Sequence, residues 1–207
     1  MTATTAVDYF VVDVETANQA LHSICQIGIA FFADGKMVDG WETLVNPQDV
    51  FHPFNVALHG IGPRTVARAP SWSDIFPKIS SMLSETVVAS HTYFDRGALS
   101  GACLRAELPE VPYARWIDTC WISRYAWPQL PNHKLPTLAR SFNISYRAHN
   151  ALEDARVAGE VLALALQERQ ITIGELLAAS GKHITGFPKP APNGRPRSAT
   201  PAAGFSR

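Results

Sequence analysis

Two acidic side chains, Asp13 and Glu15, follow the first apolar run of the sequence. Residues 9–12 (YFVV) are aromatic or β-branched, which predicts a strand buried on both faces. Side chains two residues apart in a strand point to the same side, so both carboxylates face one way. Two like charges there are costly to bury unless positive charge lies beside them, and a divalent metal ion is the strongest candidate. The alternative is that the strand ends in a loop and both acids are exposed.

Two further acids and a histidine are candidates to join this pair. Asp95 opens a predicted helix directly after a short apolar run, and Asp154 lies in the first turn of the last long helix. Acids at helix N-termini often do no more than complement the helix dipole. His149 stands in the loop five residues before Asp154. A lone loop histidine is usually a surface residue, but beside a carboxylate cluster it is the group that accepts a proton near neutral pH.

The order and spacing of these residues resemble the three motifs of the DEDD exonucleases. The motifs read, in chain order, Asp13-x-Glu15, Asp95 and His149-x-x-x-x-Asp154. The position of His149 is similar to the histidine subtype (DEDDh), which includes DnaQ-like proofreading exonucleases and ribonuclease T. The tyrosine subtype would carry Tyr where this chain has Asn150. The resemblance covers roughly residues 8–168 and extends to the stretches DVETAN, SICQIG, LVNP, HGI and NHKL.

The resemblance implies a two-metal hydrolysis site. The implied ligands of two divalent metal ions, Mg²⁺ or Mn²⁺, are Asp13, Glu15, Asp95 and Asp154. His149 would be the general base on the attacking water, which makes these five the implied catalytic residues. Similar enzymes grip the terminal nucleotide with the backbone after the second acid and with the HGI segment. The implied substrate-binding residues are therefore Thr16, His59 and Ile61.

Two positions depart from the family pattern. Gly62 follows HGI where family members often have Thr, and His91 stands where Asn is usual ahead of the second motif. Neither departure changes an implied metal ligand. They bear on the details of substrate contact.

The elements that would position these residues predict an α/β fold, and the resemblance implies that this fold is ribonuclease-H-like. We expect a mixed sheet of about five strands, over residues 9–15, 24–32, 37–45, 86–90 and 116–118. The first three should form an antiparallel meander with a hairpin turn at residues 33–36, and strand–helix units follow. Helices are predicted over residues 64–67, 71–83, 94–106, 119–126, 135–142 and 150–169. This order puts the first strand near the centre of the sheet, where ligands collect at the carboxyl ends of strands.

Composition and charge limit the remaining possibilities. The 207 residues allow one domain, expected over residues 1–180, with a Pro/Gly-rich basic tail at 181–207 that we expect to be disordered. The tail holds five of the 18 basic residues and none of the 18 acidic ones, so the rest carries a formal charge of about −5. That balance does not indicate nucleic-acid binding by bulk attraction, although metal ions could neutralise a local carboxylate cluster.

Cysteine usage and hydropathy predict a cytoplasmic protein with no membrane partner. Cys25, Cys103 and Cys120 show no CxxC pairing and should be buried free thiols. No apolar run reaches the length of a membrane span, and the first residues do not resemble a signal peptide.

The resemblance, together with the carboxylate cluster, implies a metal-dependent 3′→5′ exonuclease that releases nucleoside 5′-monophosphates. Its substrate would be the 3′ end of a nucleic acid, DNA in preference to RNA, and a polymerase or other replication or repair protein is a candidate partner. One alternative is a 3′ exoribonuclease that trims RNA. Another is a non-catalytic nucleic-acid-binding module on the same fold, against which the presence of all five implied catalytic residues argues. The oligomeric state is left open.

Overall fold

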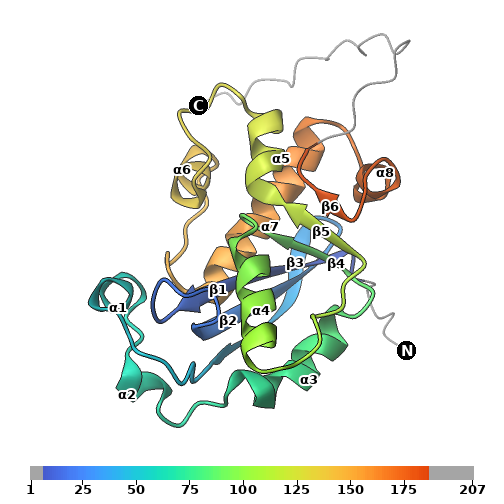
Figure 1. Cartoon of the computed structure of the whole chain (residues 1–207). Helices are drawn as coiled ribbons and strands as arrows, with labels where there is room; N and C mark the ends of the chain where they lie inside the picture. The colour runs from blue at the N-terminus through green and yellow to red at the C-terminus, as the bar shows by residue number, and fades with distance from the viewer. Residues whose placement is uncertain (1–6, 187–207) are drawn as a thin grey trace, which may run out of the picture.

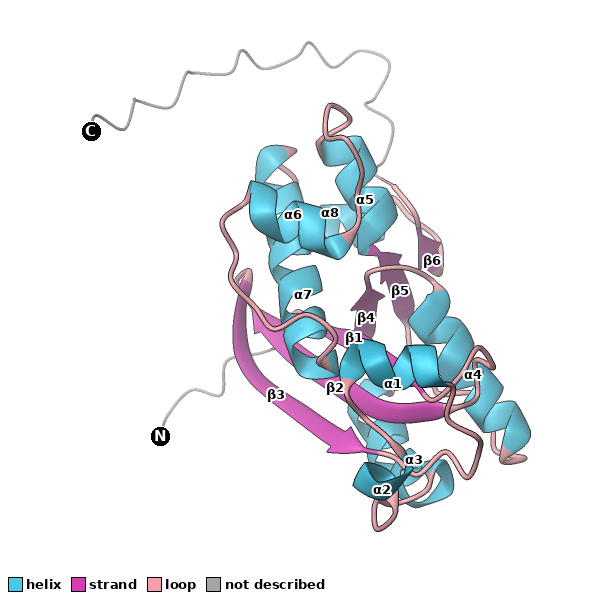
Figure 2. Cartoon of the chain, turned by 90° about the vertical axis from the view of Figure 1, so that its left-hand side faces the viewer, coloured by secondary structure: helices cyan, strands magenta, loops and turns pink. Residues whose placement is uncertain are grey.

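A mixed sheet of six strands carries the helices of the chain on its two faces (Figures 1 and 2). The computed structural model describes residues 7–186. The strands are β1 (Tyr9–Thr16), β2 (Ile24–Ala33), β3 (Lys36–Leu44), β4 (Val87–Ser90), β5 (Arg115–Asp118) and β6 (His183–Ile184). Their order in the sheet is β3-β2-β1-β4-β5-β6, so β1 is central as predicted.

The pairing of the strands confirms the predicted meander. β1 pairs with β2 and β2 with β3 in antiparallel fashion, and Asp34 and Gly35 make the turn between β2 and β3 with φ of 50° and 72°. β4 joins β1 in parallel, with Phe10 opposite Val88, and β5 joins β4 in parallel. The carboxyl ends of β1, β4 and β5 therefore meet at one edge of the sheet.

The sixth strand differs from the expectation of about five. β6 pairs in parallel with β5, with Trp116 opposite His183, and it lies within the segment that composition assigns to a tail. Only Ile184 of this two-residue strand is buried, so there is too little apolar patterning to mark a strand in the sequence. The rest of the expected tail, residues 187–207, lies outside the described residues.

Eight helices complete the described part of the chain. They are α1 (Pro53–His59), α2 (Pro63–Val66), α3 (Trp72–Leu83), α4 (Phe94–Arg105), α5 (Thr119–Ala126), α6 (Leu135–Ser141), α7 (Ala151–Glu168) and α8 (Ile173–Ala178). Asn150 caps α7 by accepting a hydrogen bond from the Glu153 amide at 3.1 Å. The Glu153 side chain pairs with Arg156 at 2.9 Å. No helix among residues 7–186 is long and apolar enough to cross a membrane.

The two faces of β1 belong to two different cores. Tyr9 and Val11 pack in the core that α5, α6 and α7 cover, whereas Val12 and Val14 pack in the core under α3 and α4. The strand alternation therefore aims Asp13 toward the α7 side, as it does the other odd-numbered residues of β1. Cys25, Cys103 and Cys120 are buried free thiols, as predicted.

Gly28 of β2 lets the start of α7 approach the sheet directly beside Asp13. Gly28 is the partner of Asp13 across the β1–β2 ladder. A Cβ atom on Gly28 would lie 2.3 Å from the backbone nitrogen of Leu152. The Gln26 side chain reinforces the contact, because its Oε1 accepts a hydrogen bond from the Ala151 amide at 3.3 Å. The absence of a side chain at Gly28 thus sets how close the acidic first turn of α7 comes to β1.

We predict that Gly28→Ala destabilises the protein by about 1–3 kcal/mol or more, because a methyl group there meets backbone that cannot rotate away. The denaturant midpoint in urea measures the loss. Gly174→Ala in α8 is the matched control, since its new Cβ would have nothing closer than 3.9 Å, and it should be neutral or slightly stabilising. Equal midpoints for Gly28→Ala and wild type would contradict the close packing.

Candidate active site

A pocket of about 250 Å³ opens where β1 ends and where α4 and α7 begin. All five residues predicted to be catalytic line it: Asp13, Glu15, Asp95, His149 and Asp154. They come from a strand, two helix N-termini and a loop that are up to 141 residues apart in the sequence. The alternative of a strand ending in open solvent is therefore wrong for Asp13 and Glu15.

Three of these side chains form a compact set of potential metal ligands. Ligand atoms of Glu15, His149 and Asp154 all lie within 4.8 Å of one another. Glu15 and Asp154 are buried, and His149 is exposed. Asp13 faces the same pocket from β1. Hard carboxylate oxygens with one imidazole are a donor set that suits divalent cations.

Backbone amides orient two of the acids. Asp95 Oδ1 accepts a hydrogen bond from the Val14 amide at 3.1 Å, which ties the start of α4 to β1 between the two strand carboxylates. Asp154 Oδ2 accepts one from the His149 amide at 2.7 Å. His149 has a φ of 63°, a left-handed conformation that brings its amide toward the first turn of α7. The loop histidine is thus anchored at its backbone by the acid five residues later.

Burial raises the pKa of every carboxyl group in the pocket, and the charges of nearby acids add to the rise. Burial, followed by the charges of Asp154 and Asp95, raises the pKa of Glu15 to about 8. Burial also raises the pKa of Asp95 to about 7 and that of Asp154 to about 6, although backbone hydrogen bonds partly oppose both shifts. The pKa of Asp13 is raised well above its usual range by burial and by its three acidic neighbours. The pocket therefore holds four ionised carboxylates at neutral pH only if positive charge is supplied.

The predicted substrate-binding residues lie together beside this pocket without lining it. His59 Nε2 lies 3.2 Å from the Thr16 carbonyl oxygen, and Nδ1 accepts a hydrogen bond from the Ile61 amide at 3.0 Å. These contacts fix a neutral ring with the proton on Nε2, and burial lowers the pKa of His59. Thr16, His59 and Ile61 are all buried. His59 therefore joins the end of β1 to the HGI segment.

Two further residues that the motif pattern does not include line the pocket. His91 Nε2 lies 2.9 Å from the His133 carbonyl oxygen and Nδ1 lies 3.0 Å from Thr119 Oγ1, which joins the NHKL stretch and α5 to the pocket. Burial lowers the pKa of His91 to about 4, so this ring is neutral. The Tyr146 hydroxyl is buried and has no hydrogen-bond partner among the described residues. Its position three residues before His149, in the same loop, is the one sequence signal that could have identified it.

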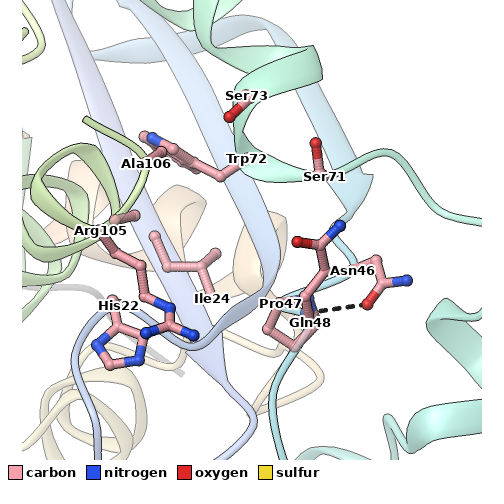
Figure 3. Close-up of a pocket in the computed structure, with 11 residues that line it drawn as sticks. His22, Ile24, Asn46, Pro47, Gln48, Ser71, Trp72, Ser73, Arg105 and Ala106 are labelled. Carbon is pink, nitrogen blue, oxygen red and sulfur yellow. Dashed lines mark hydrogen bonds between the residues drawn. The ribbon is translucent and has the colours of Figure 1, made fainter. Parts of the chain in front are cut away.

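A second pocket of about 240 Å³ lies between the end of α4 and the start of α3 (Figure 3). It is lined by His22, Asn46, Gln48 and Arg105, among others. The backbone N–H of Gln48 donates a hydrogen bond to Asn46 Oδ1 at 3.0 Å. The two pockets are about the same size, so their lining side chains distinguish them. The second contains no carboxylate and none of the predicted site residues.

Comparisons with known proteins match most of the chain to one family. Residues 10–162 match the model of the RNase_T family, described as an exonuclease. The chain is 30% identical over 167 residues to a DNA polymerase III PolC-type of Caldanaerobacter subterraneus subsp. tengcongensis. The aligned region covers 79% of this chain and 12% of that protein. It is 27% identical over 164 residues to the 3′-5′ exonuclease DinG of Staphylococcus aureus, which covers 77% of this chain and 18% of that protein. The chain spans less than a fifth of the length of either relative.

Solved structures share the ribonuclease-H-like fold. Exonuclease X in complex with 5′ overhanging duplex DNA is 23% identical, with a TM-score of 0.64 over 80% of this chain and 95% of that chain. The nuclease domain of 3′hExo, a DEDDh family member bound to rAMP, is 18% identical, with a TM-score of 0.65 over the same shares. These likenesses confirm the predicted fold class.

We predict that Glu15→Gln raises the thermal midpoint in a chelating buffer at about pH 9 and changes it little at about pH 5. The folded-state pKa of Glu15, about 8, is above the value of 4.5 that an unperturbed glutamate has. The stability that this group contributes is therefore present below about pH 4.5 and lost as the pH rises through about 8. Glutamine carries no charge at any pH and escapes that loss. Glu107→Gln, at an exposed acid beyond the end of α4, should have the same small effect at both pH values. An effect of Glu15→Gln on the thermal midpoint that does not depend on pH would contradict the raised pKa of Glu15.

Proposed function

Because this chain belongs to the RNase_T family of exonucleases, we propose that it is a metal-dependent 3′→5′ exonuclease that releases nucleoside 5′-monophosphates. The observation that carries the proposal is the convergence of four carboxyl groups with raised pKa values and one histidine in a single pocket. DNA is the proposed substrate, since a DNA polymerase is among the curated relatives. By the same reasoning, the proposed partner is a replication or repair polymerase that leaves the 3′ ends on which this chain acts.

The carboxylate pocket fits a pair of hard divalent cations. Asp13, Glu15, Asp95 and Asp154 would hold two ions, Mg²⁺ or Mn²⁺, and four acids match the four positive charges of such a pair. When bound, the ions supply positive charge beside the scissile phosphate and lower the pKa of a water molecule.

His149 is the proposed general base. Its ring is exposed and its ligand atom lies within 4.8 Å of those of Glu15 and Asp154, so it can take a proton at the pocket and pass it to solvent. The hydrogen bond from its amide to Asp154 Oδ2 holds the backbone while leaving the ring free to accept that proton. The unit formed by Thr16, His59 and Ile61 is proposed to hold the terminal nucleotide beside the pocket.

Tyr146 is a proposed contact to the phosphate. A buried hydroxyl without a partner costs free energy, and here it lies close enough to Asp154 and Asp13 for their charges, after burial, to help raise its pKa to about 12. The hydroxyl therefore stays protonated and is a hydrogen-bond donor to a phosphate oxygen that enters the pocket.

We predict that wild type shortens end-labelled DNA from the 3′ end in Mg²⁺ or Mn²⁺, and that Asp13→Ala does not.

His149→Ala should retain Mn²⁺ binding, measured as a shift of the thermal midpoint, but lose about 10²–10⁴-fold in turnover. His22→Ala is the control: this histidine pairs with Asp49 at 3.1 Å and lines the second pocket, so its loss should leave turnover unchanged. Single- and double-stranded DNA and RNA are tested in parallel. If wild type shortens none of these substrates, the exonuclease proposal is wrong. If His149→Ala has near-normal turnover, His149 is not the general base.

We predict that Tyr146→Phe lowers turnover by about 10- to 100-fold, the effect of losing a hydrogen bond to a charged group. The thermal midpoint without substrate should be unchanged or higher, because the variant removes a buried hydroxyl that has no partner. Tyr113→Phe is the matched control, since its hydroxyl lies 3.1 Å from His183 Nε2 outside the pocket. Wild-type turnover in Tyr146→Phe would show that the hydroxyl does not touch the substrate.

A further inference from the structure

Exposed aromatic side chains lie at the carboxylate pocket, where Phe94 is a lining residue, and on the helices next to it. Of the five exposed aromatic residues among residues 7–186, four lie at the start of α4 or on α5. They are Tyr93, Phe94, Trp121 and Tyr125, which are 69%, 41%, 43% and 48% exposed. Side chains of this size are usually buried, so four exposed together indicate a surface that binds something.

The starts of α4 and α5 lie next to each other and next to the pocket. β4 and β5 are parallel neighbours, so the helices that follow them begin at the same edge of the sheet. The Cys120 amide in the first turn of α5 donates to the carbonyl oxygen of His91, a residue that lines the pocket, at 3.1 Å. In Figure 1, α5 stands above α4, and both helices begin near the ends of β4 and β5. The aromatic residues at the start of α4 therefore border the pocket, and those of α5 follow a first turn that is hydrogen-bonded to a residue of the pocket.

Arginine side chains are interleaved with these aromatic rings. The Arg124 guanidinium lies over the Trp121 ring at 4.7 Å. Burial raises the pKa of Asp118, and the positive charges of Arg124 and Arg96 oppose that rise. The two arginines therefore lie near the same carboxylate. Asp118 is buried and accepts a hydrogen bond from the Trp121 amide at 3.0 Å. The acid is thus engaged inside the fold, whereas Arg124 is exposed.

We propose that the α4–α5 strip, defined as Tyr93, Arg96, Trp121, Arg124 and Tyr125, binds the single-stranded segment of the substrate on the 5′ side of its terminal nucleotide. The inference rests on the proposed exonuclease function. Three observations select this occupant: the strip is continuous with the pocket, it carries positive charge on a chain whose residues 1–180 are acidic overall, and it alternates aromatic rings with cations. Stacking platforms with interleaved cations bind unpaired nucleotides with little regard to sequence.

The geometry of α5 suits unpaired bases. Trp121 and Tyr125 are four residues apart, so they lie one above the other on the same face of the helix, about 6 Å apart along its axis. Rings at that separation can each take a base of one strand, whereas the paired bases of a duplex have no free faces. The strip therefore predicts a preference for 3′ ends with several unpaired nucleotides.

The test compares a long and a short substrate on the Trp121→Ala/Tyr125→Ala variant. A dinucleotide occupies only the pocket, and a single-stranded oligonucleotide of about 20 residues also covers the strip. The loss of two stacking contacts should raise KM for the oligonucleotide about 10- to 100-fold or more. The maximal rate and the dinucleotide turnover should not change. In a His149→Ala background, fluorescence anisotropy should show the same loss of oligonucleotide affinity without cutting.

A separate variant tests the charge of the strip. Arg124→Ala should reduce the slope of log affinity against log salt by about 0.7, the value for one phosphate contact on a single strand. Leu104→Ala/Arg105→Ala is the matched control, because it removes an exposed apolar side chain and a cation from the opposite end of the same α4, about 13 Å from Arg96. This control should leave both substrates unaffected.

The outcomes separate the strip from the catalytic function. If the strip variant keeps wild-type affinity for the oligonucleotide, the proposal is wrong and this surface serves another partner, such as a protein. If wild type cuts neither substrate, the exonuclease proposal fails, and the anisotropy measurement still decides whether the strip binds single strands. Should Trp121→Ala lower the thermal midpoint, Tyr125→Ala and Arg124→Ala alone provide the same test.

Discussion

The repulsion among four carboxyl groups, three of them buried and that of Asp13 half-buried, is the constraint on which the rest of this structure depends. Asp13 and Glu15 lie on one side of β1, and helix N-termini bring Asp95 and Asp154 against them. The charges of these two helix acids raise the pKa of Asp13 and of Glu15 on top of the effect of burial. Such an arrangement opposes its own ionisation. The fold tolerates this arrangement because rigid backbone determines the positions of the acids. The Val14 amide donates to Asp95 and the His149 amide donates to Asp154. Gly28, which has no side chain, lets α7 pack close to β2. The same arrangement that costs stability in the metal-free protein is what would bind a pair of cations tightly.

The proposed cations also resolve a contradiction of charge. A chain whose residues 1–180 carry a net negative charge has no bulk attraction for a polyanion, and four acids line its proposed catalytic pocket. Two divalent ions would reverse the sign of the field only inside that pocket, so the pocket alone could hold one phosphate but not a strand. Affinity for the rest of the strand would have to come from elsewhere on the surface. The exposed rings and arginines of α4 and α5, placed directly at the rim, are suited to that task.

Much of the fold and the site could be predicted from the sequence, for reasons that particular residues make clear. The run before Asp13 and the stripe of α7 are strong periodic signals, and the caps at Ser71 and Asn150 mark helix starts by side chains that accept backbone hydrogen bonds. The five motif residues converge because each lies near the end of a strand or the start of a helix whose position the periodicity determines. β6 escaped prediction because two residues with one buried side chain leave no pattern, and its place in the sheet is set by the ladder with β5. Tyr146 escaped for a different reason: its significance is a missing hydrogen bond, which only the folded surroundings reveal.

The histidines show how one residue type divides between structure and chemistry. His59 and His91 each use both ring nitrogens in hydrogen-bonding contacts, and burial lowers the pKa of both, so they remain neutral and hold segments together. His149 is exposed and is fixed through its backbone amide, which leaves its ring available beside Glu15 and Asp154. A group that must accept and release a proton in each turnover needs access to solvent and a ring that can turn. Of the three, only His149 meets both needs, and that difference, more than its place in a motif, is the physical argument for it as the base.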